Sequence, residues 1–314
     1  MNKITIIGSG SVGSTIAYTM TVSGLASEIV MIDINSSKAH GEALDIAQGV
    51  PFGVPCSVYA GTYADAKGSD IVIITSGIPR KAGQSRLELA QVNIDVTKKI
   101  IPEITRYAPD AVYVIVSNPV DILTYVFNKC SDIPENKIIG SGTILDTARV
   151  RAKLSEHYAI SQKNVHAYVL GEHGDSSFIP WSLANISNIP IAECSKSFSP
   201  NGEFVPELNY AEVEEYVRKS GGRVIEQKGA TFYAVSASVC HLCKCLLGSM
   251  DSTMTVSTMM HGEYGIDDVC LSVLCTAGSK GIQGKVMLPL NDTEIKLLQH
   301  SAEQLKEIIR NTKI

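Results

Sequence analysis

The sequence predicts an α/β fold in which a doubly wound parallel sheet is followed by an α+β domain. Two observations support this prediction. Over roughly the first 140 residues, short β-branched runs alternate with segments of helical spacing, and the runs are continuously apolar, as in strands buried on both faces of a parallel sheet. After Gly140 the pattern changes to longer helices and antiparallel-looking strands. We therefore expect two domains, residues 1–140 and 141–314.

The first domain is expected to consist of repeated β-α-β units. The expected strands are Lys3–Ile7, Glu28–Asp33, Ile71–Thr75 and Ala111–Ser117. The expected helices between them are Val12–Val22, Lys38–Gln48 and Leu87–Tyr107. Pro102 is expected to break or kink the last helix, because proline removes a hydrogen bond from a helix interior.

The second domain mixes helices with strands. We expect helices at Thr143–Tyr158, Asn209–Leu247 and Asp292–Arg310, the second broken near Gly221-Gly222 and the last docked on the core by its apolar face. The expected strands are Val165–Leu170, Met254–Met260, Val269–Thr276 and Val286–Pro289. Three prolines and several serines predict a surface loop over Ile189–Pro206.

The composition excludes several classes of protein. With 27 Lys and Arg against 32 Asp and Glu, the formal net charge is −5, which argues against a nucleic-acid partner because such partners need a basic surface. No apolar segment approaches the roughly 18–20 residues of a membrane helix. The apolar run at the amino terminus ends at Ile7, too early for a signal peptide. We therefore expect a cytoplasmic protein whose eight cysteines stay reduced.

Three of these cysteines lie close together in the sequence. Cys240, Cys243 and Cys245 fall in an apolar stretch of helical spacing, where the thiols cannot all point to one ion. We interpret them as small buried hydrophobic residues and expect no metal site.

A glycine-rich turn follows the first expected strand. Gly8, Gly10 and Gly13 form a G-x-G-x-x-G pattern that opens the next helix, and Asp33 follows twenty residues later at the end of the second strand. Gly8 suits a tight turn, Gly10 a close approach of the backbone to a pyrophosphate, and Gly13 close packing of helix on strand. The residues expected to bind the cofactor here are Gly8, Gly10, Val12, Gly13 and Asp33. This is the Rossmann-type pattern. The Asp33 carboxylate would bind ribose hydroxyls and repel a 2′-phosphate, so the sequence predicts NAD as the cofactor.

Three further segments carry chemistry. Asp146 and Arg149 lie three residues apart on an expected helix and therefore share a face. His173 lies in the glycine-flanked turn Gly171–Ser176 after an expected strand. Ser117 and Asn118 end another strand, at the edge where open parallel sheets bind ligands.

These segments resemble the NAD-dependent L-lactate/L-malate dehydrogenase family over nearly the whole chain. The runs G-E-H-G-D-S, S-N-P-V-D and G-T-I-L-D-T-A-R are most similar to the bacterial L-lactate branch. The resemblance implies reversible NADH-dependent reduction of pyruvate to L-lactate by a homotetramer. His173 would donate the proton, which suits its ordinary pKa of roughly 6.5, and Asp146 would orient it.

The resemblance also implies the remaining substrate contacts. Arg149 would bind the substrate carboxylate in a bidentate pair. Arg86, beside the closing loop Ser76–Ser85, would stabilise charge on the substrate oxygen. Asn118 would bond that oxygen and Thr231 would line the pocket. Ser117 and Asn118 would also contact the cofactor.

One position departs from the lactate pattern. Arg80 stands where lactate enzymes of the family carry Gln and malate enzymes carry Arg, which pairs with the second carboxylate of oxaloacetate. An arginine facing a methyl group in a closed pocket would be an uncompensated charge. The alternatives are therefore a lactate enzyme in which Arg80 turns outward or broadens the substrate range, and a malate enzyme.

Two other possibilities concern regulation. Arg151 and His166 match the positions at which bacterial lactate dehydrogenases activated by fructose 1,6-bisphosphate bind that effector. A catalytically silent NAD-binding regulator on the same fold is a third alternative, because fold does not imply activity.

Overall fold

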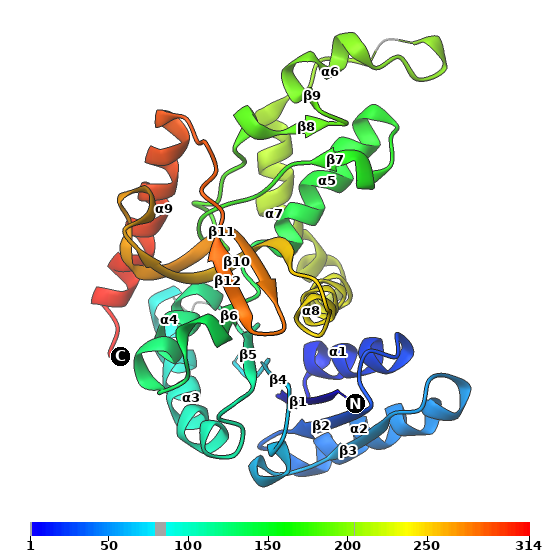
Figure 1. The fold of residues 1–314 in the computed structure, drawn as a ribbon, viewed down its shortest axis with the longest axis vertical. Coiled ribbons are helices and arrows are strands. Elements are labelled where there is room, and N and C mark those ends of the chain that lie inside the picture. The colour runs from blue at the N-terminus through cyan, green and yellow to red at the C-terminus, as the bar shows by residue number, and fades with distance from the viewer. Residues whose placement is uncertain (1, 79–85, 204) are drawn as a thin grey trace.

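A nine-stranded sheet forms the centre of the protein in a computed structural model that describes residues 2–78, 86–203 and 205–314, without the side chains of Arg86 and Asn201 (Figure 1). Within these residues the strand order is β12-β11-β10-β6-β5-β4-β1-β2-β3. The parallel strands are β1 (Lys3–Ile7), β2 (Glu28–Ile32), β3 (Ser57–Ala60), β4 (Ile71–Ile74), β5 (Val112–Ile115) and β6 (Ile138–Gly140). Their order, 3-2-1-4-5-6, is that of a doubly wound dinucleotide-binding sheet. The predicted fold class is confirmed.

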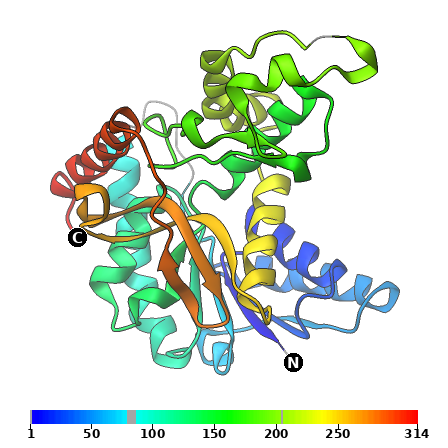
Figure 2. The ribbon, with the colours of Figure 1, turned by 45° about the horizontal axis from the view of Figure 1, so that its top comes forward.

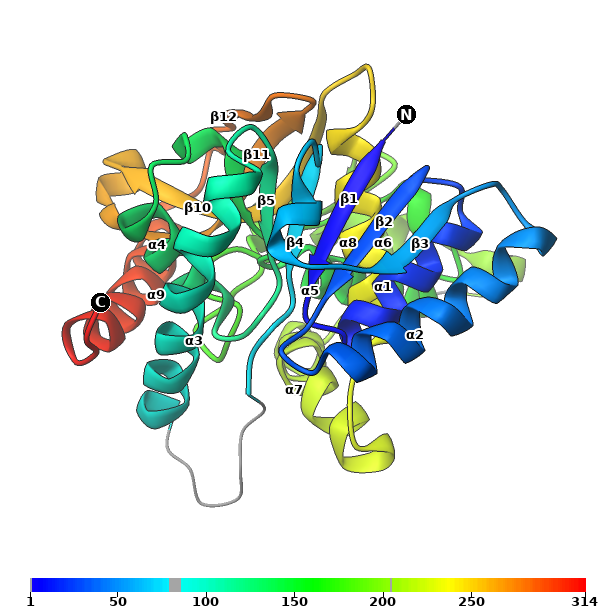
Figure 3. The ribbon, with the colours of Figure 1, turned by 90° about the horizontal axis from the view of Figure 1, so that it is seen from below.

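Helices flank this parallel part of the sheet. They are α1 (Ser11–Val22), α2 (Ser36–Gly49), α3 (Arg86–Tyr107) and α4 (Val120–Cys130). Figure 3 shows α1 and α2 together on one side and α3 and α4 on the other. The strands other than β3 are almost fully buried, because apolar side chains on both faces meet helices. β3, at the edge of the sheet, is partly exposed. Pro102 lies inside α3, which continues to Tyr107, so the helix does not end at this proline.

The sheet continues with antiparallel strands from the second part of the chain. These are β10 (Ser252–His261), β11 (Asp267–Gly278) and β12 (Gly281–Lys285), and β10 pairs with β6 where Ser257 lies opposite Gly140. Helix α8 (Tyr233–Leu246) packs on α1, and α9 (Asp292–Arg310) packs on β11 and α4. The predicted docking of the last helix on the core is confirmed, since Leu298, Ala302 and Leu305 are buried.

A smaller lobe stands above this sheet in Figures 1 and 2, where it is coloured mainly green. It has its own apolar core, built on Val150, Leu154 and Val217 among others. Its elements are α5 (Ile144–Tyr158), β7 (Val165–His166), β8 (Asn185–Ile186), β9 (Ile189–Pro190), α6 (Ile191–Ser197) and α7 (Tyr210–Lys228). The short 3-10 turns of the chain are η1 (Val50–Phe52), η2 (Tyr63–Ala66), η3 (Glu135–Lys137), η4 (Gln162–Asn164), η5 (Trp181–Leu183), η6 (Pro200–Gly202) and η7 (Glu263–Gly265).

Several predicted boundaries are wrong. Helix α7 runs through Gly221-Gly222, because glycine weakens a helix without ending it; the chain leaves the helix at Gly229, whose φ is +84°. The segment Ile189–Pro206 contains β9 and α6 rather than only loop. The last strand is β12 and not Val286–Pro289, and β7 stops at His166, after which Leu170 forms a single bridge to Phe178.

The cysteines of α8 lie as the sequence predicts. Cys240 and Cys243 are buried in the main core and Cys245 is half-buried. Burial raises the pKa of Cys240 to about 12, so this thiol stays protonated at neutral pH. Among the described helices none combines the length and the apolarity needed to cross a membrane.

Candidate active site

The glycine-rich turn connects β1 to α1 at the carboxyl end of the sheet. Gly8 has φ +105°, and a Cβ on Gly13 would lie 1.9 Å from the Gly8 carbonyl oxygen, so both positions require glycine. A Cβ on Gly10 would meet nothing within 4 Å, which leaves open space beside the main chain. The amino terminus of α1 has no side-chain cap. Its free N–H groups and the open space at Gly10 fit the pyrophosphate of a dinucleotide.

Asp33 follows β2 and braces this turn. Its carboxylate accepts hydrogen bonds from the main-chain nitrogens of Ser9 at 2.6 Å and Asn35 at 2.9 Å. Val12 lies in the first turn of α1, and its carbonyl oxygen accepts a bond of 3.4 Å from Ser236 on α8. The predicted cofactor residues of β1, α1 and β2 are thus brought together at one edge of the sheet.

Ser117 and Asn118 follow β5 at the same edge. The Ser117 hydroxyl donates to the Ser76 carbonyl oxygen at 2.6 Å. The buried side chain of Asn93, on α3, donates to the carbonyl oxygen of Asn118 at 2.8 Å and exchanges hydrogen bonds with the main chain of Ile78. Asn93, which no sequence motif indicates, connects the segments that follow β4 and β5.

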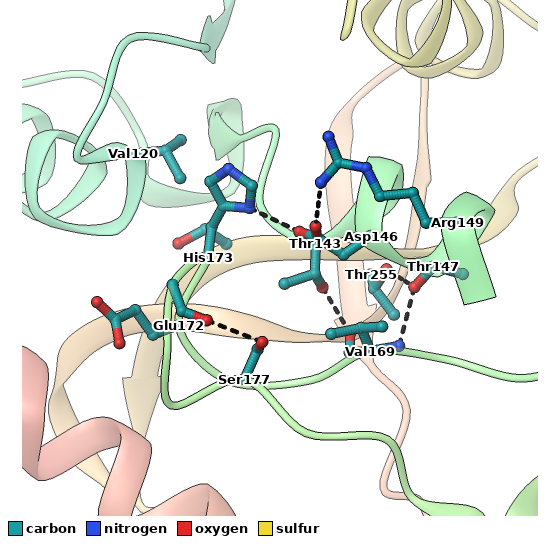
Figure 4. Close-up of polar contacts among 12 residues, drawn as sticks. Val120, Thr143, Asp146, Thr147, Arg149, Val169, Glu172, His173, Ser177 and Thr255 are labelled. Carbon is teal, nitrogen blue, oxygen red and sulfur yellow. Dashed lines mark hydrogen bonds and ion pairs between the residues drawn. The ribbon is translucent and has the colours of Figure 1, made fainter. Parts of the chain in front are cut away.

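His173, Asp146 and Arg149 form a connected group (Figure 4). His173 Nδ1 lies 2.6 Å from Asp146 Oδ2, and Arg149 Nη1 lies 2.7 Å from Asp146 Oδ1. The Asp146 side chain is 7% exposed, whereas that of His173 is 29% exposed. The carboxylate is therefore buried behind a partly accessible imidazole and guanidinium.

The electrostatics of this group favour the charged forms. Burial alone would lower the pKa of His173, but the carboxylate of Asp146 and, to a smaller extent, that of Asp121 outweigh it, so the pKa lies above its ordinary value of 6.5. Burial would raise the pKa of Asp146, but His173 and Arg149 outweigh it, so that pKa lies below 3.8. At neutral pH the pair carries a negative carboxylate and tends to retain the imidazole proton.

Hydrogen bonds between α5 and the neighbouring segment place Asp146 beside the His173 turn. Thr143 Oγ1 donates to the Val169 carbonyl oxygen at 2.5 Å, and the Val169 nitrogen donates to Thr147 Oγ1 at 2.9 Å (Figure 4). These contacts align the first turn of α5 with the chain that leads into Gly171. Asp146, in that first turn, also benefits from the positive end of the helix.

The remaining predicted substrate residues are Thr231, Arg80 and Arg86. Thr231 is half-buried in the link between α7 and α8, and Arg149 lies beside Gly221 of α7. Arg80 lies outside the described residues. Arg86 begins α3, but its side chain lies outside the described part.

The two residues predicted to bind an effector both belong to the small lobe, Arg151 to α5 and His166 to β7. Arg151 Nε donates to the Ala167 carbonyl oxygen at 3.1 Å, and its guanidinium lies 5.4 Å from the centre of the Tyr168 ring. Burial lowers the pKa of Arg151 below its ordinary value. His166, on β7, is exposed.

Fold and site together are those of a dinucleotide-dependent dehydrogenase. Residues 2–140 match the lactate/malate dehydrogenase NAD-binding domain, and residues 143–313 match the lactate/malate dehydrogenase alpha/beta C-terminal domain. The chain belongs to the lactate/malate dehydrogenase family, as the sequence motifs indicate. Its cofactor is NAD.

Similar proteins are described as lactate dehydrogenases. The chain is 46% identical over 321 residues to an L-lactate dehydrogenase of Acetivibrio thermocellus, covering 100% of this chain and 98% of the relative. An L-lactate dehydrogenase of Clostridium botulinum is 44% identical, covering 98% and 96%. Among solved structures, the minor L-lactate dehydrogenase of Enterococcus mundtii has a TM-score of 0.93 at 33% identity, covering 100% of this chain and 99% of that chain. The L-lactate dehydrogenase of Clostridium thermocellum has a TM-score of 0.87 at 37% identity, covering all of both chains.

Proposed function

We propose that this protein is an L-lactate dehydrogenase that reversibly reduces pyruvate with NADH. The observation that supports it most is the contact of 2.6 Å between His173 Nδ1 and Asp146 Oδ2, with Arg149 on the other carboxylate oxygen. The similarity to L-lactate dehydrogenases over the full chain favours pyruvate as the substrate.

The residues at the carboxyl edge of the sheet would hold the cofactor. They are Gly8, Gly10, Val12, Gly13, Asp33, Ser117 and Asn118. Bound NADH supplies the hydride that reduces the carbonyl carbon of the substrate. The Asp33 carboxylate would accept hydrogen bonds from ribose hydroxyls and repel a 2′-phosphate, which favours NAD over NADP.

His173 would supply the proton. Its Nδ1 is engaged by Asp146, which leaves Nε2 to donate to the carbonyl oxygen of pyruvate. In the direction of lactate oxidation, the neutral imidazole would accept the hydroxyl proton. The raised pKa of His173 keeps the donor form present near neutral pH.

Cationic and polar groups would hold the substrate. The Arg149 guanidinium has five N–H donors, so it can keep its bond to Asp146 and bind the substrate carboxylate. We assign Arg86 to the carbonyl oxygen, where a second cation stabilises developing charge. Asn118 and Thr231 would complete the pocket.

Arg80 favours a second candidate, L-malate dehydrogenase, because an arginine can pair with the second carboxylate of oxaloacetate. Purified protein assayed with NADH on each keto acid decides between them. We expect the higher kcat/KM with pyruvate; a value far below that for oxaloacetate would reject the lactate proposal. His173→Asn should abolish turnover in either case. Unchanged turnover in that variant would show that His173 is not the proton donor. A wild type that binds NADH and reduces neither keto acid would instead indicate an NAD-binding regulator.

We also propose a cytoplasmic homotetramer that responds to fructose 1,6-bisphosphate through Arg151 and His166. In the cytoplasm the eight cysteines of the chain would stay reduced. The proximity of Arg151 to the strand that carries His166 supports a shared phosphate site. Sedimentation tests the homotetramer, and assays with and without fructose 1,6-bisphosphate test the response to this effector. Activation should disappear in Arg151→Gln, and activation that persists there would place the effector elsewhere.

A further inference from the structure

Asp121 is a buried carboxylate that contacts the main chain of His173. It lies in the first turn of α4 and is 2% exposed. Its Oδ2 accepts a hydrogen bond of 2.8 Å from the His173 main-chain nitrogen, and its Oδ1 accepts one of 2.6 Å from the Ser257 hydroxyl on β10. Asp121 therefore connects α4 and β10 to the turn that carries the imidazole. In Figure 4 the start of α4, marked by Val120, lies beside His173.

The same turn is held from β11. Gly171 and Ser272 exchange two main-chain hydrogen bonds, each of 2.9 Å. Ser272 is paired with Ser257 across β10 and β11. Two neighbouring serines of the sheet thus hold Asp121 and Gly171, one through its side chain and one through its main chain. These contacts fix the main chain around His173 independently of the contact between Asp146 and its ring.

We propose that Asp121 is a positioning residue for proton transfer at His173, because it fixes the main chain of the turn and its negative charge, added to that of Asp146, keeps the imidazole protonated. This inference rests on the proposed function, in which His173 is the proton donor. It assigns a role to a group that neither binds substrate nor touches the imidazole ring.

The charged groups around His173 support an electrostatic effect. Among the described side chains, Asp146 and Arg149 face it from α5 and Asp121 from α4. Burial is the largest influence and lowers the pKa of His173, the two carboxylates raise it, and Arg149 lowers it. Around Asp121 itself, Glu172 opposes ionisation and His173 favours it. The balance at His173 thus depends on a second carboxylate.

The hydrogen bonds and the size of the Asp121 side chain do not by themselves require a carboxylate at this position. An asparagine could accept from the His173 nitrogen and donate to the Ser257 hydroxyl without burying a charge. Burial raises the pKa of Asp121 to about 6, which shows how unfavourable the charge is there. The aspartate is explained if its charge acts on the imidazole.

The experiment compares Asp121→Asn, which keeps the shape and removes the charge, with Asp121→Ala and Ser257→Ala. Glu294→Gln is the matched control, because Glu294 is also buried and accepts hydrogen bonds from the main chain and side chain of another residue, Ser182, at 3.1 and 2.7 Å. Two quantities are measured for each: the pH dependence of kcat/KM with the keto acid that the wild type reduces, and the titration of the His173 ring by NMR of histidine-labelled protein, assigned with His173→Asn.

In Asp121→Asn we expect the ring titration and the alkaline limb of kcat/KM to move to lower pH by roughly 0.5 to 1 unit, since removal of a nearby negative charge disfavours imidazolium. Turnover at low pH should stay near that of the wild type. Ser257→Ala should shift the ring titration and the alkaline limb in the same direction as Asp121→Asn, but by a smaller amount. Asp121→Ala should also lower kcat by roughly tenfold or more, because the turn loses its support. Glu294→Gln should leave both quantities unchanged.

A ring titration and an alkaline limb in Asp121→Asn that superimpose on those of the wild type would overturn the inference, even if turnover fell. If Asp121→Ala does not fold, the other two variants decide the question. Failure of the proposed function has a different signature: His173→Asn would keep full turnover, or the wild type would reduce neither keto acid, while the NMR titration would still report the action of Asp121 on His173.

Discussion

Asp33 and Ser9 are joined by a hydrogen bond of 2.6 Å from the Ser9 main-chain nitrogen to the Asp33 carboxylate, which ties the end of β2 to the glycine-rich turn after β1. The other carboxylate oxygen accepts from the Asn35 nitrogen at 2.9 Å. The residue proposed to choose between NAD and NADP therefore also braces the turn that would hold the pyrophosphate. Substitutions at this position must separate the two effects.

Asp33→Asn should weaken the preference for NADH over NADPH and leave the fold of the glycine-rich turn largely unchanged. The amide oxygen can still accept from Ser9, but the charge that would repel a 2′-phosphate is gone. We expect the ratio of kcat/KM for NADH over NADPH to fall roughly tenfold or more, as for the loss of a charge-assisted bond. Asp33→Ala should weaken the binding of both cofactors.

Asp70→Asn is the matched control for this prediction. Asp70 also accepts from a main-chain nitrogen, that of Lys3, at 2.8 Å, but at the opposite end of β1. It should leave the cofactor ratio unchanged. An unchanged ratio in Asp33→Asn would mean that Asp33 does not meet the ribose.

Gly10→Ala should separate cofactor binding from folding. A Cβ at position 10 meets no atom of the protein within 4 Å, and the main chain there has φ −75°, so the melting temperature should hardly change. The methyl group would occupy the space proposed for the pyrophosphate, so the Kd of NADH should rise roughly tenfold or more. Fluorescence titration and thermal unfolding measure both quantities.

The control for Gly10→Ala is Gly41→Ala in α2, where a Cβ also meets nothing within 4 Å. That change should stabilise the protein by about 0.5 to 1 kcal/mol through helix propensity and leave the Kd of NADH unaltered. Normal NADH binding by Gly10→Ala would refute the proposed position of the pyrophosphate.

Asp121→Asn should make the protein more stable at neutral and alkaline pH. Burial raises the pKa of Asp121 from 3.8 to about 6, so the folded state holds a proton that the unfolded state releases between these values, and the wild type loses stability as pH rises through that window. Above pH 6 the full cost, roughly 3 kcal/mol, is present in the wild type and absent from the variant. The advantage of the variant should shrink as pH falls from 6 towards 4.

Asp65→Asn supplies a control of opposite sign. Hydrogen bonds from the Thr62 nitrogen at 2.7 Å and from its hydroxyl lower the pKa of Asp65, so its charge stabilises the fold above that pKa, and its loss should lower the melting temperature slightly. Melting temperatures of both variants are compared with the wild type from pH 4 to 8 at one scan rate. A less stable Asp121→Asn at pH 8 would show that the carboxylate serves folding.

Long, strongly patterned segments could be predicted from the sequence alone. The runs of Ile and Val in β1, β4 and β5 are buried on both faces, and α9 has the predicted bounds, because Asn291 caps it and Glu294 completes a capping box. In the first part of the chain, helix α4 and strands β3 and β6 were not predicted. Residues 120–127 of α4 are all buried, and a short apolar run of this kind does not distinguish a buried helix from a buried strand. Strand β6 has only three residues.

The candidate site shows the same division. His173, Asp146 and Arg149 stand in motifs whose spacing indicates chemistry, and the structure joins them directly. Asp121 stands in one of those motifs, S-N-P-V-D, yet no role was assigned to it. Its role depends on contacts with residues 52 and 136 positions away along the chain and on its burial. The spacing of residues in a sequence reveals neither these long-range contacts nor the burial of a side chain.

Arg80→Gln tests the one residue that departs from the lactate pattern. If Arg80 faces the substrate, its guanidinium opposes the methyl group of pyruvate and pairs with the second carboxylate of oxaloacetate. Glutamine at that position should therefore raise kcat/KM for pyruvate and lower that for oxaloacetate, so that their ratio changes by roughly tenfold or more, about 1.4 kcal/mol. Lys81→Gln removes the neighbouring positive charge and is the matched control for the overall charge of this segment. Equal effects of the two variants would mean that charge near the site matters and that Arg80 does not contact the substrate. If neither variant changes the ratio, the choice of substrate depends on the groups of the described site. Arg149 would then be the sole partner for a substrate carboxylate among the residues proposed.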